Sequence, residues 1–331
     1  MPTKYHFCNS LSWESGQDVS TRFGPQQTGG SIIQHVRPVD LQASMAQGAE
    51  ILARWAGILA ETGIEIAGIT FADEIATWQQ VANDYTARTR LMWRNGWFRD
   101  YDSVAKEWSA EQDAMHLAPV FCGVADWEQI ERLRPALAEP PSNNPYWRPL
   151  SWPPIIMTVA EAASVAGMPA EAAELAYRFI DASYRSIDSR TPDEYGNIPG
   201  ITRENRRLVT SGKWGATDYV NSGIEGYGWG AVSVFLLLRH LLGLHEEKAD
   251  VIKVAPVFPQ ALRRVGATYH AGPVPWGKYL LHFQCIVRDS SSYSMQMRCA
   301  VQTAPEAPQG VVEHQWAWEG AWGDERVVHL P

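Results

Sequence analysis

The sequence predicts a mainly helical protein with a small β-rich region at its C-terminal end. Apolar residues recur at helical spacing through six segments, near residues 39–60, 72–94, 127–137, 155–166, 169–186 and 231–244. From about residue 251 apolar and polar residues alternate instead, which is typical of half-buried strands. We therefore predict a helical domain over residues 1–250 and a β-rich region over residues 251–331 packed on it.

Composition limits the kind of protein that this chain forms. Its 331 residues are 45% hydrophobic, which is enough to bury a core. The net charge of −9 argues against a nucleic-acid partner, because such binding needs clustered Lys and Arg. The first residues contain no apolar leader, and the longest apolar stretch, residues 231–238, is too short to span a membrane. We expect a cytoplasmic protein without a membrane partner.

The four cysteines also favour a cytoplasmic protein. They are few and scattered, which suits free, buried thiols in a reducing cytoplasm. A bridge between Cys285 and Cys299 across a strand pair is the alternative.

For two of the helical segments, the sequence predicts an apolar face or an end point. In the first, Leu41, Met45, Ala49, Leu52 and Trp55 continue into Ile58 and Leu59 as one apolar face. The second is predicted to continue to Arg94, to end at Asn95-Gly96 and to give way to an extended piece that starts at Trp97.

The stretch from Trp13 to Phe23 contains more side chains suited to catalysis or binding than any other part of the sequence. It holds two carboxylates, Glu14 and Asp18, together with Arg22 and two aromatic residues. A carboxylate held among aromatic rings loses solvent, which raises its pKa and keeps it protonated near neutral pH, as a general acid requires. An acidic, Ser-rich surface loop is the alternative interpretation.

This stretch also resembles a known family. The pattern Glu-Ser-Gly-x-Asp-x-Ser-x-Arg-Phe over residues 14–23 is similar to the general-acid loop of the clan that holds the α,α-trehalases and the processing α-glucosidase I family, with their bacterial glucosylglycerate and mannosylglycerate hydrolase relatives. The resemblance implies that Asp18 is the general acid and that Trp13, Glu14 and Arg22 contact substrate. One position departs from the pattern, because Gln17 stands where the family usually has Trp.

Two further stretches resemble segments of the clan in the same order. Residues 39–43 are similar to its Val-Asp-Leu-Asn-Ala segment, with Gln42 in place of Asn as a candidate for binding a hydroxyl. The alternative is a helix start in which Asp40 favours the first turn. Residues 91–102 resemble a passage that ends in Asp-Tyr-Asp, so Trp97 and Asp100 are candidates for lining a sugar cleft. A core position is the alternative for Trp97.

Two aromatic motifs follow. Residues 144–154 resemble the family motif Tyr-Trp-Arg-Gly-Pro-x-Trp-Pro without its Gly, and three prolines stiffen the segment. Rings stack on sugar faces and Arg donates from a planar fork, so the segment is a candidate sugar subsite. Residues 227–230 resemble the segment that leads into the last helix of the clan's domain. The candidate substrate-binding residues from both motifs are Trp147, Arg148, Trp152, Tyr227 and Trp229.

The candidate general base lies between these motifs. Family members carry Glu-x-Tyr-x-x-x-x-Gly, and an ungapped match on Tyr195 and Gly200 places Asp193 on the family's Glu, with Glu194 one step on. Either Asp193 or Glu194 is the base in this interpretation, and Tyr195 contacts substrate. An exposed acidic turn is the alternative.

The resemblance covers roughly residues 10–245 and implies an (α/α)6 toroid with a sugar pocket at one end. We count six or seven helices where a closed toroid has twelve, so the toroid is expected to be incomplete at its N-terminal side, with a homo-oligomer or a partner chain completing it. The implied activity is inverting hydrolysis of a small α-glucoside or oligosaccharide, with no cofactor. No metal is expected, because His240 and His245 lack the spacing of a helical zinc pair. The alternatives are a degenerate or truncated carbohydrate-binding relative and a non-enzymatic helical interaction protein.

Overall fold

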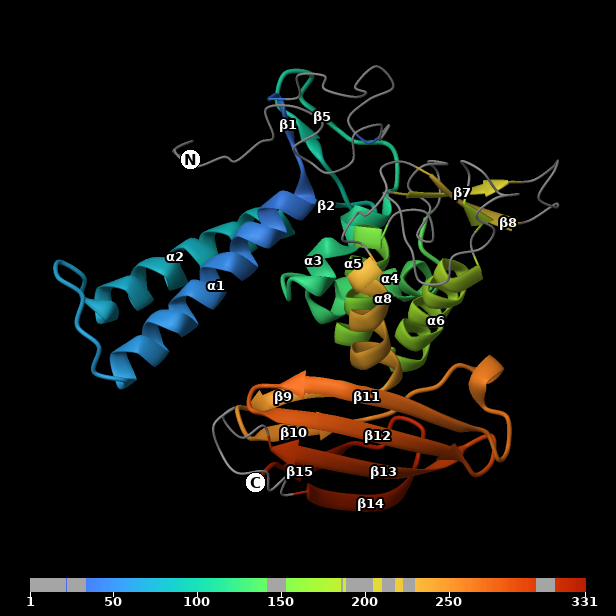
Figure 1. Cartoon of the computed structure of the whole chain (residues 1–331). Coiled ribbons are helices and arrows are strands. Elements are labelled where there is room, and N and C mark those ends of the chain that lie inside the picture. Colours follow the sequence, from blue (N-terminus) through green and yellow to red (C-terminus); the bar gives the residue numbers. More distant parts are fainter. Residues whose placement is uncertain are drawn as a thin grey trace. The chain divides into compact units, whose positions relative to one another are not determined.

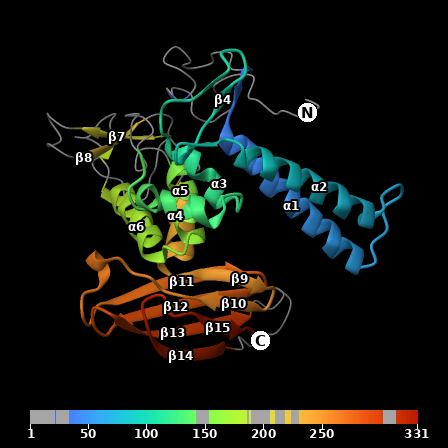
Figure 2. The same cartoon turned by 180° about the vertical axis from the view of Figure 1, so that it is seen from behind.

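The computed structural model describes residues 22, 34–141, 153–185, 187–188, 205–209, 218–222, 230–301 and 313–331. The chain forms two compact units. The first comprises Met1–Ala172 with Asp181–Val232, and the second comprises Ala173–Ile180 with Ser233–Pro331. Helices dominate the first unit and antiparallel sheets the second (Figures 1 and 2). Among the described helices, none has the length and hydropathy that a membrane crossing needs.

The first unit begins with a pair of long helices, α1 (Val39–Glu61) and α2 (Phe71–Arg90). They lie side by side and run in opposite directions (Figure 1). Small side chains form the buried seam of α1, which allows the two backbones to approach closely: Ala43, Ala46, Ala49, Ala53 and Ala56. The predicted apolar face was partly wrong, because Leu52, Trp55 and Ile58 are 36%, 56% and 51% exposed. The short alanines, rather than the large apolar residues, face the partner helix.

The alanine seam of α1 predicts that a larger side chain there lowers the stability of the fold. Ala46 is buried in a cluster with Tyr85 of α2 and Val124. Ala46→Leu is expected to lower the free energy of unfolding by about 1–3 kcal/mol, because the added side chain overpacks the seam. Ala60→Leu is the matched control, since Ala60 is exposed on the same helix. Urea denaturation measures both variants, and equal stability of the two would contradict a tight seam.

The chain after α2 differs from the prediction. Helix α2 ends at Arg90, and β2 (Trp93–Arg94) pairs antiparallel with β3 (Trp97–Phe98). Asn95 and Gly96 form the two-residue turn between these strands, with φ values of 52° and 78°. An Asn-Gly pair with positive φ at both positions favours such a hairpin, so it turns two strands here instead of ending a helix. Strand β4 (Tyr101–Asp102) then lies between β1 (Val36–Arg37) and β5 (Glu107–Trp108).

Short helices complete the described core of the first unit. They are η3 (Ala114–Leu117), α3 (Ala118–Phe121), α4 (Trp127–Ala138), α5 (Pro153–Val165) and α6 (Pro169–Arg185), of which the last contributes to both units. Helix α4 starts at a capping box, in which Asp126 and Gln129 each bind the other's backbone N–H. The helices predicted near 127–137, 155–166 and 169–186 are confirmed. A small sheet has the order β6 (Ile187–Asp188), β8 (Asp218–Ser222), β7 (Asn205–Val209).

The second unit contains two antiparallel sheets. After α8 (Gly230–Leu236) and the π-helix η4 (Leu237–Leu241), β10 (Val251–Val254) lies between β9 (Leu244–Lys248) and β15 (Arg326–His329). The 3-10 helix η5 (Gln260–Leu262) precedes the second sheet, which has the order β11 (Thr268–Trp276), β12 (Tyr279–Val287), β13 (Ser292–Val301), β14 (Glu313–Ala321). The predicted strands near 279–287 and 293–301 are confirmed, whereas the helix predicted over 231–244 ends early, at Leu241.

The β-strand register also decides the question of the cysteines. Cys285 lies opposite Met295, and Cys299 lies opposite Leu281, so the two thiols are out of register. Cys122, Cys285 and Cys299 are free and buried, as predicted, and Cys8 lies outside the described residues. Burial raises the pKa of Cys122 and of Cys285 to about 12, which keeps both thiols protonated at neutral pH.

Candidate functional site

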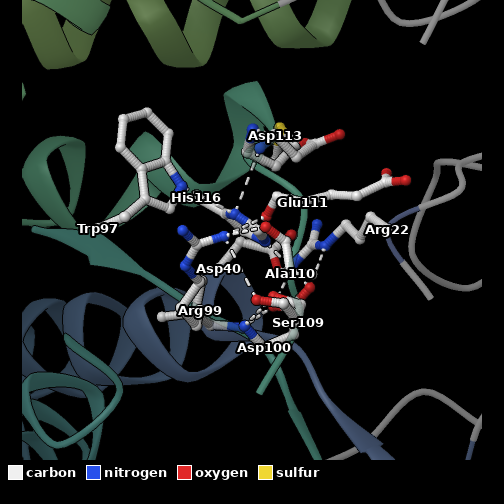
Figure 3. A network of polar contacts seen from close by, with 12 residues as sticks. Arg22, Asp40, Trp97, Arg99, Asp100, Ser109, Ala110, Glu111, Asp113 and His116 are labelled. Carbon is white, nitrogen blue, oxygen red and sulfur yellow. Dashed lines mark hydrogen bonds and ion pairs between the residues drawn. The ribbon is translucent and has the colours of Figure 1, made fainter. Parts of the chain in front are cut away.

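A buried carboxylate, Asp100, is the centre of the polar network in the first unit (Figure 3). It lies between β3 and β4 and is 1% exposed. The Arg22 guanidinium binds it in a bidentate manner, with Nε donating to Oδ2 at 2.7 Å and Nη2 donating to Oδ1 at 2.9 Å. The backbone N–H of Val39, the first residue of α1, donates to Oδ1 at 2.8 Å. Asp100 therefore joins three segments that are far apart in the sequence.

A second carboxylate shares the same guanidinium. Nη2 of Arg22 also donates to Oδ1 of Asp40, in the first turn of α1. The Arg22 side chain is completely shielded from solvent, and the Asp40 side chain is 13% exposed. Two carboxylates thus compensate one buried cation, and the bond to Asp40 ties residue 22 to the beginning of α1.

His116 of η3 completes the network from the other side. Its Nε2 lies 3.1 Å from Oδ2 of Asp100. Its Nδ1 accepts a hydrogen bond from the Trp97 indole N–H at 3.0 Å and one from the backbone N–H of Asp113 at 3.3 Å. Because Nδ1 accepts from two donors, the proton of the ring is on Nε2 and is donated to Asp100. We call Arg22, Asp40, Asp100 and His116 the Arg22 anchor.

The electrostatics of the anchor favour its charged form. Burial alone would raise the pKa of Asp100, but the Arg22 cation and His116 outweigh it and hold this pKa well below its ordinary value. Burial would likewise lower the pKa of Arg22, whereas Asp100 and Asp40 raise it well above the usual value. The carboxylate and the guanidinium therefore stay ionised together at neutral pH.

The backbone around Asp100 is fixed by its own contacts. Its N–H donates to Oγ of Ser109 at 3.0 Å, and the Ser109 N–H donates to the Asp100 carbonyl oxygen at 2.9 Å. Arg99 donates to the carbonyl oxygens of Ala110 and Glu111 at 2.7 and 2.8 Å. Four hydrogen bonds to residues 109–111 therefore hold the segment that carries the central carboxylate.

Four of the candidate site residues lie among the described residues. Arg22 is in the anchor, and Trp97 is 4% exposed with its indole N–H on His116. Gln42 is 3% exposed and lines a cavity between α1, α2 and the β4–β5 hairpin. The predicted substrate contacts of Arg22, Trp97 and Gln42 remain predictions. Asp100 is buried and its carboxylate has four hydrogen bonds to protein groups, and its predicted place in the lining of a sugar cleft also stays a prediction.

The other candidate site residues fall outside the described residues, and their predicted roles are unchanged. They are Trp13, Glu14, Asp18, Trp147, Arg148, Trp152, Asp193, Glu194, Tyr195, Tyr227 and Trp229.

Sequence reasoning did not find the anchor. Arg22 and Asp100 are 78 positions apart, and neither helical nor strand periodicity connects them. Asp40 was read as a cap-region acid, and His116 had no motif around it. Among the described residues, no group of three or more His, Cys, Asp or Glu side chains is arranged to hold a metal ion.

Comparison with known proteins gives the class. The family model described as Trehalase matches residues 12–241, which is more than half of the chain. The chain therefore belongs to the trehalase family, and the family prediction made from its motifs is confirmed. A comparison with curated proteins finds no match.

Solved structures of the same kind are similar to it at low identity. Neutral trehalase Nth1 from Saccharomyces cerevisiae is 19% identical, with a TM-score of 0.45, over 68% of this chain and 40% of that one. GH63 mannosylglycerate hydrolase from Thermus thermophilus, in complex with glucose, is 19% identical, with a TM-score of 0.46, over 63% of this chain and 49% of that one. The chain spans less than half the length of these structures.

Proposed function

We propose that this chain is an inverting α-glycoside hydrolase that acts on a small α-glucoside or oligosaccharide. The observation that carries the proposal is the trehalase-family match over residues 12–241, which includes Asp18, Asp193 and Glu194. Asp18 protonates the glycosidic oxygen, and Asp193 or Glu194 activates a water on the opposite face of the sugar. Inverting enzymes keep such carboxyl groups about 6.5–9.5 Å apart, which leaves room for that water.

The Arg22 anchor supports this mechanism by positioning the acid. Arg22 is four residues after Asp18, and four residues of chain span at most about 14 Å. Fixing the Arg22 guanidinium on two carboxylates therefore restricts where Asp18 is able to lie. A general acid works only when its geometry matches the leaving oxygen, so a rigid anchor near it contributes to catalysis by orientation.

The same proposal covers the fold and the assembly. We propose that the helices belong to an incomplete (α/α)6 toroid over residues 1–250, with the β-rich region over 251–331 packed on it. A partner chain or a second copy of this chain completes the toroid. The exposed large side chains of α1, Ile51, Leu52, Trp55 and Ile58, support such an association, because large exposed apolar patches mark interaction surfaces. The free buried thiols support a reducing cytoplasm.

A carbohydrate-binding relative without hydrolytic activity is the second candidate. Two departures from the family pattern favour it, namely Gln17 where the family has Trp before the acid and Asp193 where it has Glu. Loss of an aromatic wall beside Asp18 would leave the acid more solvated, which lowers its pKa and weakens it as a proton donor.

The function is tested by glucose release from a panel of α-glucosides, namely trehalose, kojibiose, nigerose and glucosylglycerate. We expect at least one to be hydrolysed. Asp193→Asn and Glu194→Gln, assayed on that substrate, identify the base, because only the loss of the true base removes roughly 10²–10⁴-fold of the rate. Glu65→Gln is the matched control, since Glu65 is an exposed acid in the α1–α2 loop. Binding of a panel member without any release would favour the second candidate instead.

A further inference from the structure

We propose that a pocket in the first unit binds a small anionic molecule, a hydroxylated ring compound that carries a phosphate or carboxylate group. The pocket lies between β1, the second half of α2 and the β4–β5 hairpin, and its volume is about 640 Å³. Small-molecule sites typically measure roughly 300–1,000 Å³. We call it the arginine pocket, after Arg37, Arg88 and Arg94 in its wall.

Aromatic rings hold two of these arginines in place. The Arg94 guanidinium carbon lies 4.6 Å from the ring centroid of Trp108, and that of Arg37 lies 5.9 Å from the ring centroid of Tyr101. The two rings contact each other with centroids 4.8 Å apart, because Tyr101 and Trp108 are opposite residues of the β4–β5 pair. A guanidinium held against a ring keeps N–H groups at its edge for a planar or tetrahedral anion.

The described part of the pocket wall carries more positive than negative charge. Among the described residues that line it, one carboxylate, Asp84, stands beside the three arginines. Within the described part of the chain, neither Arg37 nor Arg94 forms an ion pair with a carboxylate, and Arg94 donates instead to the carbonyl oxygen of Trp93 at 2.7 Å. The chain as a whole carries a net charge of −9, so this local excess of cations is unlike its average surface. Arginine binds phosphate and carboxylate in a bidentate manner, so a wall with three arginines suits an anion.

The other residues of the pocket wall indicate what the ligand contains besides its anionic group. Gln42 supplies an amide, and the Tyr101 and Trp108 rings border the same space. Amides bind hydroxyl groups and aromatic rings pack on the C–H faces of sugars. A sugar phosphate or a sugar acid combines these features. The inference does not rest on the hydrolase proposal, because it concerns binding of an anion and not cleavage of a glycosidic bond.

Calorimetric titration of the full chain tests the proposal with glucose 6-phosphate, glucuronate and neutral glucose as probes. We expect one or both anions to bind, glucose to bind at least about tenfold more weakly, and the affinity to fall as salt is added. Binding of glucose 6-phosphate alone assigns a phosphate ligand, and binding of glucuronate alone assigns a carboxylate ligand.

Variants locate the site. Arg94→Gln is expected to lower the affinity for the anion about tenfold, because it removes one charged donor from the pocket. Arg37→Gln is an independent second variant on a different element. Arg132→Gln is the matched control, since Arg132 is exposed on α4 outside the pocket. The proposal is overturned if neither anion binds, if glucose binds as tightly as the anions, or if neither pocket variant changes the affinity.

Discussion

Asp18→Asn is expected to lower kcat for the hydrolysed α-glucoside by roughly 10²–10⁴-fold, which is the usual contribution of a general acid. The amide has nearly the same shape as the carboxylic acid but has no proton to give to the glycosidic oxygen. The affinity for the substrate should change much less, because the substitution is close to isosteric. Steady-state kinetics with a folded variant measures both quantities.

The leaving group provides a control for this variant. Fluoride departs without protonation, so hydrolysis of α-glucosyl fluoride should lose far less rate in Asp18→Asn than hydrolysis of a disaccharide does. Glu65→Gln should behave like the unaltered chain on both substrates. An equal loss on the two substrates would show that Asp18 does not act as the proton donor.

The second large effect is on stability. Asp100→Ala is expected to lower the free energy of unfolding by about 3–5 kcal/mol, because it leaves the Arg22 cation buried with one of its two carboxylates removed. Glu107→Ala is the matched control, since Glu107 is exposed on β5 and its removal should cost less than about 0.5 kcal/mol. Urea denaturation followed by circular dichroism measures both.

The double variant Arg22→Met with Asp100→Ala separates the charge effect from lost packing. It should be less destabilised than the sum of the two single variants, because removing both partners leaves no uncompensated charge of this pair. Strict additivity, or a loss below about 1 kcal/mol in Asp100→Ala, would contradict the anchor.

The anchor also predicts a pH dependence. The folded pKa of Asp100 lies below the ordinary value of 3.8, so its stabilisation is fully present above that value. It is lost as the pH falls further, towards the lowered pKa of the folded state. The unaltered chain should therefore lose stability below about pH 4, and Asp100→Ala should lose less over the same range.

The sequence predicted elements whose signal is local. Helices such as α4 and strands such as β12 follow their periodicity and their caps, and the acid-loop motif identified the family. The Asn95-Gly96 pair was misread because the same dipeptide ends helices and turns hairpins. The buried face of α1 was predicted wrongly because a hydrophobicity pattern counts large apolar residues as more buried than alanine. Two closely packed helices instead need small side chains between them. The Arg22–Asp100 pair could not be predicted, since it depends on contacts that no single sequence records.

The measurement that most directly tests the proposed mechanism is the anomer of the first product. The hydrolysed α-glucoside is followed by proton NMR at early times, before the released sugar equilibrates between its two anomers. Attack by a water on the face opposite to Asp18 predicts that β-glucose appears first and converts to the α-anomer later. Initial release of α-glucose would contradict direct inversion and would require a covalent intermediate on the enzyme.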